Sequence, residues 1–302
     1  MGRITPAGVI SEFPSHPCLF AVFPPACGAA GIAAGPDGNL WIAAFAIPPY
    51  VIGRLTTGGI YTDVVPTPYP GTLWSITLGP DGNLWAVGDR SGSPNAVVRL
   101  TTSGAATLFG FPSGGYGDGA RQIINGPDGN LWATETGQKK IARVTTSGAI
   151  TEFPAGPGSP EGLAVGPDGA IWFTEFPTGI RRMTLTGAIT RTIPTSVGDA
   201  ICTGPDGNIW FGLFEPASIG RLKADGSITT YAIPSGWRAY AMVPGPDGNI
   251  WFAGGTTVGK VDLSVVRQLD EALDVPASST PMKLVMLLGI VIVGLRLLAG
   301  RP

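Results

Sequence analysis

Four acidic side chains offer the clearest candidates for chemistry in this sequence. They are Glu135, Glu161, Glu175 and Asp199. Carboxylate oxygens are the ligands that hard cations such as Mg²⁺ or Ca²⁺ prefer. Carboxylates held close together also raise one another's pKa, so that one of them can carry a proton. The alternative is that these acids are solvated or form ion pairs with Arg121, Arg143 or Arg181.

Other catalytic candidates are few. The only histidine, His16, lies between Ser15 and Pro17 and is expected to be an exposed loop residue. No GxSxG, HExxH, phosphate-binding or kinase motif occurs. Cys18 and Cys27 either form a disulfide in an exported protein or remain thiols, and Cys202 is expected to be a core residue.

A repeated motif must position these side chains. The segment GPDGNLW, or a close variant, occurs six times, and its first glycines are Gly35, Gly79, Gly126, Gly166, Gly204 and Gly245. Intervals near forty residues are typical of stacked or radial repeats. Pro, Asp and Gly favour a tight turn, so PDG predicts a reversal between two strands, and the following Trp is expected in a shared core.

A second hairpin alternates with the first. The copy at 142–154, ARVTTSGAITEFP, alternates apolar and polar residues with the period of a half-exposed strand. Two hairpins per repeat make a four-stranded unit of the size of a propeller blade, so the sequence predicts an all-β β-propeller. Six inner hairpins favour six blades, and an incomplete seven-bladed ring is the alternative. We expect residues 9–13 to pair beside residues 258–263 and close the ring.

Comparison of the repeats shows where an asymmetric site would be built. The residue five places before each framing glycine varies, and the six are Ala30, Trp74, Arg121, Glu161, Asp199 and Tyr240. Variation on a constant scaffold indicates a ligand site in the central funnel. We expect Trp74, Arg121 and Tyr240 to bind ligand there, with core packing as the alternative for the two aromatic residues. Glu135, Glu175 and Asp199 are the predicted metal ligands.

Composition limits the partners. The 19 Lys and Arg residues nearly balance the 21 Asp and Glu residues, which disfavours nucleic acid. We expect a monomer that binds a small molecule, a peptide or a glycan. Residues 2–14 match an outer hairpin, so the chain opens in the middle of a blade, and no signal peptide follows Met1. A start truncated upstream is a hypothesis that explains both features.

The C-terminal part of the chain differs in composition. Residues 1–269 are predicted to form the propeller, 270–281 a linker, and 282–302 a hydrophobic segment. Twelve uninterrupted apolar residues, 284–295, predict a hydrophobic helix that anchors the chain to a membrane through residues 284–300 or acts as a sorting tail, and a buried helix is the alternative. The flanking charges favour an external propeller at the cell envelope.

The two alternating motifs, GPDGNLWxTE and IGRLTTSGxITEFP, resemble the streptogramin lyases, the virginiamycin B lyase family, over about residues 1–263. The resemblance implies a propeller, seven-bladed in that family, that opens the ester of cyclic type B streptogramins by elimination with Mg²⁺. Such a reaction needs a base for the α-proton, an acid for the leaving oxygen and a metal to polarise the carbonyl.

The resemblance also implies a catalytic histidine directly before an inner strand, and none of the six corresponding residues is His. Glu161, Glu135 and Glu175 match acidic positions of the family, and Glu161 is the candidate base. Two functions therefore stand: a non-catalytic ligand-binding or surface-displayed propeller, or an active Mg²⁺-dependent lyase on a cyclic depsipeptide, with a role in antibiotic resistance.

Overall fold

The computed structural model describes residues 2–5, 7, 9–12, 28–45, 51–66, 71–90, 94–114, 119–254, 257–274 and 295–296. The chain divides into two compact units. The first comprises Met1–Thr5 and Val9–Thr195, and the second comprises Pro6–Gly8 and Ser196–Pro302. His16, Cys18, Cys27 and most of the predicted hydrophobic segment lie outside the described residues.

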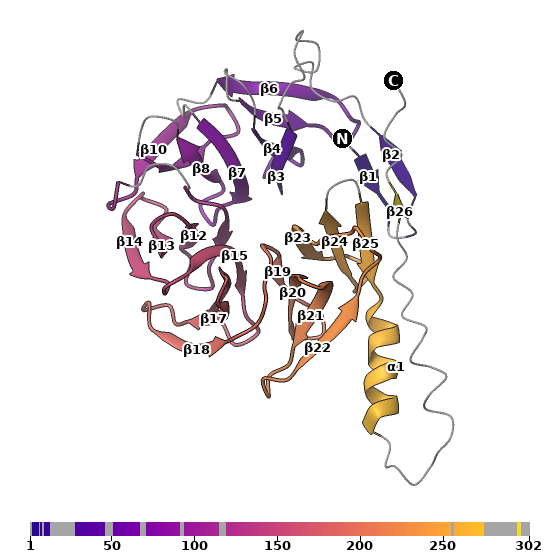
Figure 1. Cartoon of the computed structure of the whole chain (residues 1–302). Helices are drawn as coiled ribbons and strands as arrows, with labels where there is room; N and C mark the ends of the chain where they lie inside the picture. The colour runs from indigo at the N-terminus through magenta and orange to yellow at the C-terminus, as the bar shows by residue number, and fades with distance from the viewer. Residues whose placement is uncertain are drawn as a thin grey trace. The chain divides into compact units, whose positions relative to one another are not determined.

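The first unit holds four antiparallel sheets of four strands, each a meander of consecutive strands (Figure 1). The first sheet contains β3 (Gly28–Ala34), β4 (Leu40–Phe45), β5 (Val51–Leu55) and β6 (Tyr61–Pro66). The second contains β7 (Gly71–Leu78), β8 (Leu84–Arg90), β9 (Ala96–Leu100) and β10 (Ala106–Gly110). The third contains β11 (Ile123–Asn125), β12 (Leu131–Glu135), β13 (Lys140–Val144) and β14 (Ile150–Pro154). The fourth contains β15 (Ser159–Val165), β16 (Ile171–Phe176), β17 (Gly179–Met183) and β18 (Ile189–Ile193).

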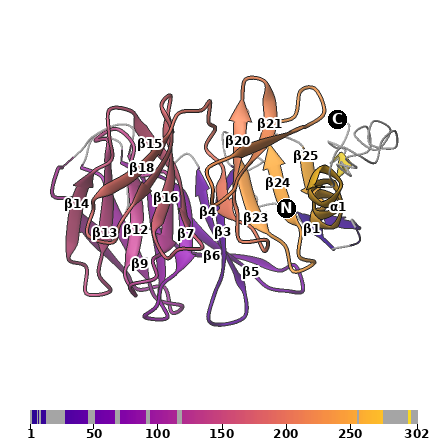
Figure 2. The same ribbon diagram turned by 90° about the horizontal axis from the view of Figure 1, so that it is seen from below.

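The second unit holds two further four-stranded sheets and a helix (Figure 2). The fifth sheet contains β19 (Ile201–Thr203), β20 (Ile209–Phe214), β21 (Ala217–Leu222) and β22 (Ile228–Ala232). The sixth contains β23 (Ala241–Pro244), β24 (Ile250–Gly254), β25 (Thr257–Val261) and β26 (Leu295–Arg296), and helix α1 spans Leu263–Asp274. Six four-stranded sheets among the described residues confirm the all-β fold with six blades.

The repeated motif forms the predicted inner turn. All six second glycines of GPDG have φ between 70° and 74°, a backbone conformation that glycine adopts without strain. The motif tryptophan is buried in five sheets and half-buried in the sixth. The motif aspartate accepts a hydrogen bond from the indole nitrogen of that tryptophan, at 2.9 to 3.1 Å in all six copies. The turn and the core of each sheet are therefore fixed to each other.

The chain ends differ from the predictions. Strands β1 (Gly2–Ile4) and β2 (Ile10–Glu12) pair with each other in a two-stranded sheet. The outer partner of β25 is β26, where the sequence predicted the N-terminal strand. The predicted linker begins inside α1, because residues 270–274 complete that helix. Of the predicted hydrophobic helix only Leu295 and Arg296 are described, and they form β26.

Among the described residues, no helix is both long enough and apolar enough to cross a bilayer.

Candidate functional site

In three sheets the variable residue lies within the innermost strand, where the backbone departs from regular pairing. In the first, second and fourth sheets the register between the two innermost strands shifts at this residue. These residues are Ala30, Trp74 and Glu161. A β-bulge redirects a side chain out of the regular alternation and is common beside active sites. Arg121, the corresponding residue of the third sheet, lies in the loop just before β11.

Trp74 and Arg121 form one aromatic and cationic pair in the first unit. The guanidinium carbon of Arg121 lies 4.7 Å from the centre of the Trp74 ring, within the range of a cation–π interaction. The indole nitrogen of Trp74 donates to the carboxylate of Asp89 at 2.7 Å, and the Gly119 backbone nitrogen donates to the same carboxylate at 2.5 Å. Trp74 and Arg121 are both half-buried. Asp89 therefore joins the Trp74 ring to the loop that carries Arg121.

Backbone hydrogen bonds fix the position of this loop. The hydroxyl of Thr134, in β12, accepts from the backbone nitrogens of Arg121 at 3.2 Å and of Gln122 at 3.0 Å. The side-chain oxygen of Gln122 accepts from the backbone nitrogen of Leu163, in β15, at 2.5 Å. The third sheet is thus tied to the strand that carries Glu161, and the three variable residues rest on a rigid frame.

The resulting group combines three kinds of recognition. Trp74 supplies a flat apolar ring, Arg121 a planar donor, and Asp89 and Glu161 supply carboxylates. Glu161 is half-buried and belongs to β15, which lies against β11. We use the name variable-residue cluster for Trp74, Asp89 and Arg121, which contact one another or share a loop, together with Glu161 on the neighbouring strand β15. Such a set suits a ligand with both donor and acceptor groups around an apolar body.

The side chain of Glu175 binds residues of its own sheet and the loop beside it. Its carboxylate is fully buried and accepts from the Arg181 Nε at 2.5 Å, from the Gly158 backbone nitrogen at 3.2 Å and from the Thr178 hydroxyl. Register places Arg181 opposite Phe173, two residues before Glu175. The ion-pair alternative considered for the acids therefore describes Glu175.

Glu135 occupies the same place in the third sheet without an arginine. Its side chain is 3% exposed, and its Oε2 accepts from the Ser113 hydroxyl at 3.0 Å. Ala142 stands at the position that corresponds to Arg181. Lys140 pairs with Glu152 at 2.6 Å, and the Oε1 of Glu135 has no hydrogen-bond partner among the described residues. Burial, reinforced by the nearby Glu152, raises the pKa of Glu135 to about 7.

The predicted metal ligands belong to different units, Glu135 and Glu175 to the first and Asp199 to the second. In the part of the chain that the structure describes, no group of three or more His, Cys, Asp or Glu side chains could hold a metal ion. Asp199 and Tyr240 belong to the second unit, where Asp199 is exposed. Tyr240 is 48% exposed and meets Phe214 edge-on at 6.2 Å between ring centres.

Several residues of the site were missed in the sequence. Asp89, near the end of β8, is not one of the six variable positions that were compared between the repeats. Thr134 and Gln122 act through side-chain oxygens that accept from backbone nitrogens, a role that residue spacing does not indicate. By contrast, Cys202 is buried as predicted, and burial raises the pKa of its thiol to about 12.

Solved structures of known proteins identify the fold class. The chain resembles the crystal structure of selenomethionine-substituted virginiamycin B lyase from Staphylococcus aureus, with 30% identity and a TM-score of 0.66 over 78% of this chain and 81% of that one. A catalytically inactive histidine-to-alanine form of the same S. aureus lyase, with quinupristin, matches at 29% identity and a TM-score of 0.67 over 78% and 81%. A streptogramin B lyase structure matches at 28% and 0.67 over 81% and 82%. The fold class is therefore the β-propeller.

The family follows from the sequence match. The model of the virginiamycin B lyase family matches residues 1–154 and 71–271, which together cover most of the chain. The chain belongs to the virginiamycin B lyase family. No match was found among curated protein sequences.

Proposed function

We propose that the chain is a non-catalytic, ligand-binding member of the virginiamycin B lyase family, and that the variable-residue cluster binds the ligand. One observation carries the proposal. The positions before the inner strands, where the family resemblance implies a catalytic histidine, hold other residues, and two of these, Trp74 and Arg121, stack on each other. A stacked Trp–Arg pair is suited to binding, and neither side chain acts as a proton base at neutral pH.

A relative supports the loss of catalysis. In the S. aureus virginiamycin B lyase, replacement of one histidine by alanine gives a protein described as catalytically inactive, which was nevertheless crystallised with quinupristin. Ligand recognition and turnover are therefore separable on this fold. The present chain has a single histidine, His16, which lies outside the six variable positions.

The chemistry of the cluster favours a peptide-like ligand. Arg121 can donate to carbonyl or carboxylate oxygens, and the carboxylates of Asp89 and Glu161 can accept from amide nitrogens. The Trp74 ring offers an apolar surface for a side chain or an aromatic substituent. Peptides and depsipeptides present all three kinds of group within a short distance.

The Mg²⁺ that the resemblance implies does not fit the residues found. The carboxylate of Glu175 is neutralised by Arg181, and that of Glu135 is buried against Ser113. A magnesium site needs several oxygen ligands with room for water. We derive no step through a metal.

Binding of quinupristin, followed by tryptophan fluorescence and calorimetry, tests the proposal. We expect saturable binding that Trp74→Ala and Arg121→Ala each weaken about tenfold, because truncated aromatic and arginine contacts commonly cost that much. Arg191→Ala, in the outer strand β18, is the matched control and should bind like the unaltered chain.

Two results would overturn the assignment. One is the absence of measurable binding by the folded protein. The other is equal affinity in the Trp74→Ala, Arg121→Ala and control variants, which would place the ligand elsewhere.

A further inference from the structure

In the first unit, the outer part of the second sheet is covered by a turn of the third sheet. Arg99, in β9, donates to the Thr146 carbonyl in the β13–β14 turn at 3.2 Å. Phe109, in β10, stacks on Trp85 with 5.6 Å between ring centres and lies against Gly148 of that turn, where an added Cβ would come within 2.0 Å of the ring. The turn therefore supplies both a carbonyl and a surface without a side chain.

The same arrangement recurs between the third and fourth sheets. Arg143 donates to the Leu185 carbonyl in the β17–β18 turn at 3.3 Å. Phe153 stacks on Trp132 at 5.7 Å and lies against Gly187. Both arginines stand opposite the motif tryptophan of their own sheet. The contact is thus a repeated property of neighbouring sheets.

The fifth sheet has the same residues facing a different partner. Arg221 stands opposite Trp210, and Tyr231 stacks on Trp210 at 5.4 Å, as the phenylalanines do in the second and third sheets. The sixth sheet has no corresponding turn, because β25 ends at Val261 and the chain enters α1 at Leu263.

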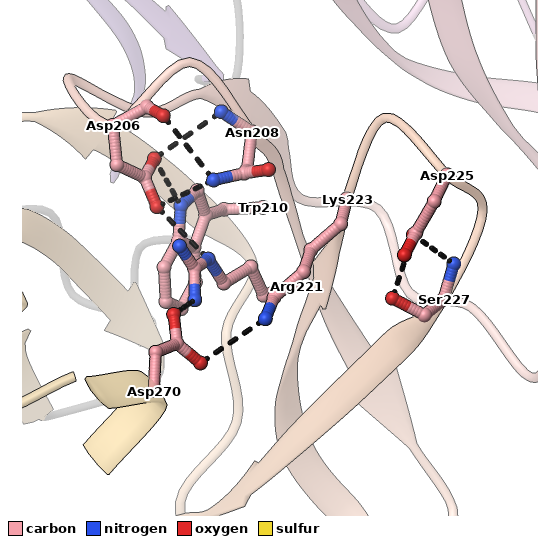
Figure 3. Close-up of polar contacts among 8 residues, drawn as sticks. All are labelled: Asp206, Asn208, Trp210, Arg221, Lys223, Asp225, Ser227 and Asp270. Carbon is pink, nitrogen blue, oxygen red and sulfur yellow. Dashed lines mark hydrogen bonds and ion pairs between the residues drawn. The ribbon is translucent and has the colours of Figure 1, made fainter. Parts of the chain in front are cut away.

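Helix α1 lies where the turn would be. Leu263 and Val266 are buried in the core cluster that contains Trp210 and Tyr231. Asp270, further along the helix, accepts from the Arg221 Nη1 at 2.5 Å and from the Lys223 Nζ at 3.1 Å, as Figure 3 shows. The carboxylate of Asp270 thus accepts a hydrogen bond from Arg221, as a backbone carbonyl accepts one from Arg99 and from Arg143.

We propose that α1 is a strap that replaces the missing turn of the sixth sheet, and that the contact of Asp270 with Arg221 and Lys223 holds it closed over the core of the fifth sheet. The start of the strap is fixed independently. The backbone nitrogen of Leu263 donates to the Asn249 side chain at 2.9 Å, and Asp262 caps the helix by accepting from the Ser264 backbone nitrogen at 2.9 Å. Loss of the Asp270 contact therefore frees the later turns of α1 while its first turn stays attached.

The opposite charges of Asp270 and of Arg221 and Lys223 support an electrostatic contact that holds α1 in place. Burial alone would raise the pKa of Asp270, but the hydrogen bonds from Arg221 and Lys223 outweigh burial and hold that pKa below its usual range. Arg221 also contacts the turn aspartate Asp206 at 2.9 Å, so one guanidinium links the inner turn, the motif tryptophan and the strap. Partly exposed ion pairs are weakened by salt, which makes closure sensitive to ionic strength.

Hydrogen exchange of the full chain, measured by mass spectrometry, tests the strap. We expect Asp270→Asn to raise amide exchange about tenfold in α1 and in β21–β22, because a charge-assisted contact is lost, and to leave β9–β10 unchanged. Asp225→Asn is the matched control, since Asp225 lies in the β21–β22 turn and its carboxylate binds Ser227 (Figure 3). The unaltered chain should show the same local increase at high salt.

Two outcomes would overturn the proposal. If Asp270→Asn exchanges like the control, the ion pairs do not hold α1. If exchange rises equally in all sheets, Asp270 supports global stability and not a local closure. Should Asp270→Asn fail to fold, Val266→Ala provides the same comparison, since it removes apolar contact from the strap and leaves its charges in place.

Discussion

At the scale of single residues, two equivalent glutamates show how one substitution changes chemistry. Glu175 and Glu135 occupy the same strand-end position, but only Glu175 has an arginine partner. A carboxylate that is buried beside another acid keeps its proton to higher pH. Burial and the nearby Glu152 raise the pKa of Glu135 to about 7, and Ala142 offers no cation at the place where Glu175 has Arg181.

A pH dependence follows for Glu135. Its pKa is raised from 4.5 to about 7, so the folded chain retains a proton that the unfolded chain has released. The free energy of unfolding is therefore unaffected by the ionisation of Glu135 below pH 4.5. As the pH rises from 4.5 to about 7, ionisation of Glu135 lowers the free energy of unfolding by up to about 3 kcal/mol. Glu135→Gln should remove this part of the fall, measured by urea denaturation between pH 4.5 and 8.

Comparing the unfolding free energies of Glu135→Gln and the unaltered chain at two pH values tests whether Glu135 is protonated in the folded chain. Glu135→Gln should resemble the unaltered chain near pH 4.5 and exceed it in unfolding free energy near pH 8. A difference of the same size at both pH values would show that Glu135 is not protonated in the folded chain.

At the scale of elements, the β16–β17 hairpin is held together by a buried charge pair. Glu175 is 0% and Arg181 14% exposed, and removal of one buried partner leaves the other uncompensated. Arg181→Met should therefore lower the free energy of unfolding by about 3 kcal/mol or more. Arg182→Met is the control, because the pair of Arg182 with Asp168 is partly exposed and worth about 1 kcal/mol or less. Chemical denaturation of both variants measures the difference.

The expected recovery makes this prediction specific. The double variant Glu175→Gln, Arg181→Met should regain part of the loss, since no buried charge then remains. Equal losses in Arg181→Met and Arg182→Met would contradict the account of this hairpin.

Sequence patterns predicted the regular elements better than the irregular ones. The PDG and TTSG turns could be predicted from the sequence because few residues other than glycine adopt a positive φ. The six inner hairpins could then be predicted from the PDG turns. Helix α1 was missed because Asp270 was interpreted as the start of an acidic linker. The half-buried carboxylate of Asp270 contacts Arg221, 49 residues away in the chain, and local composition cannot indicate such a contact.

The candidate site was predicted in part for the same reason. Variation between repeats predicted a site at Trp74, Arg121 and Glu161, and the structure places Trp74 against Arg121. The variation did not reveal that Glu135 binds Ser113, in the loop after β10, or that Glu175 pairs with Arg181 of its own sheet. Side-chain direction at a strand end depends on tertiary partners such as Ser113 and Arg181, which residue spacing does not specify.

At the scale of the whole molecule, the chain keeps the scaffold of its family and changes the residues presented on it. Residues 1–271 match the family, and the motif turns and tryptophans recur in every sheet. Fold does not fix function, because function depends on the side chains placed at a site. We therefore propose that this propeller binds its ligand and does not cleave it.

Incubation of the purified chain with quinupristin and Mg²⁺, analysed by chromatography and mass spectrometry, tests that claim most directly. The S. aureus virginiamycin B lyase is the positive control. Elimination opens the ring without a change in mass, whereas hydrolysis adds one water, so retention time and fragmentation distinguish the two products. We expect quinupristin to be recovered intact. A linear product of unchanged mass that is formed by this chain and lost in Glu161→Gln would show that the chain is a lyase.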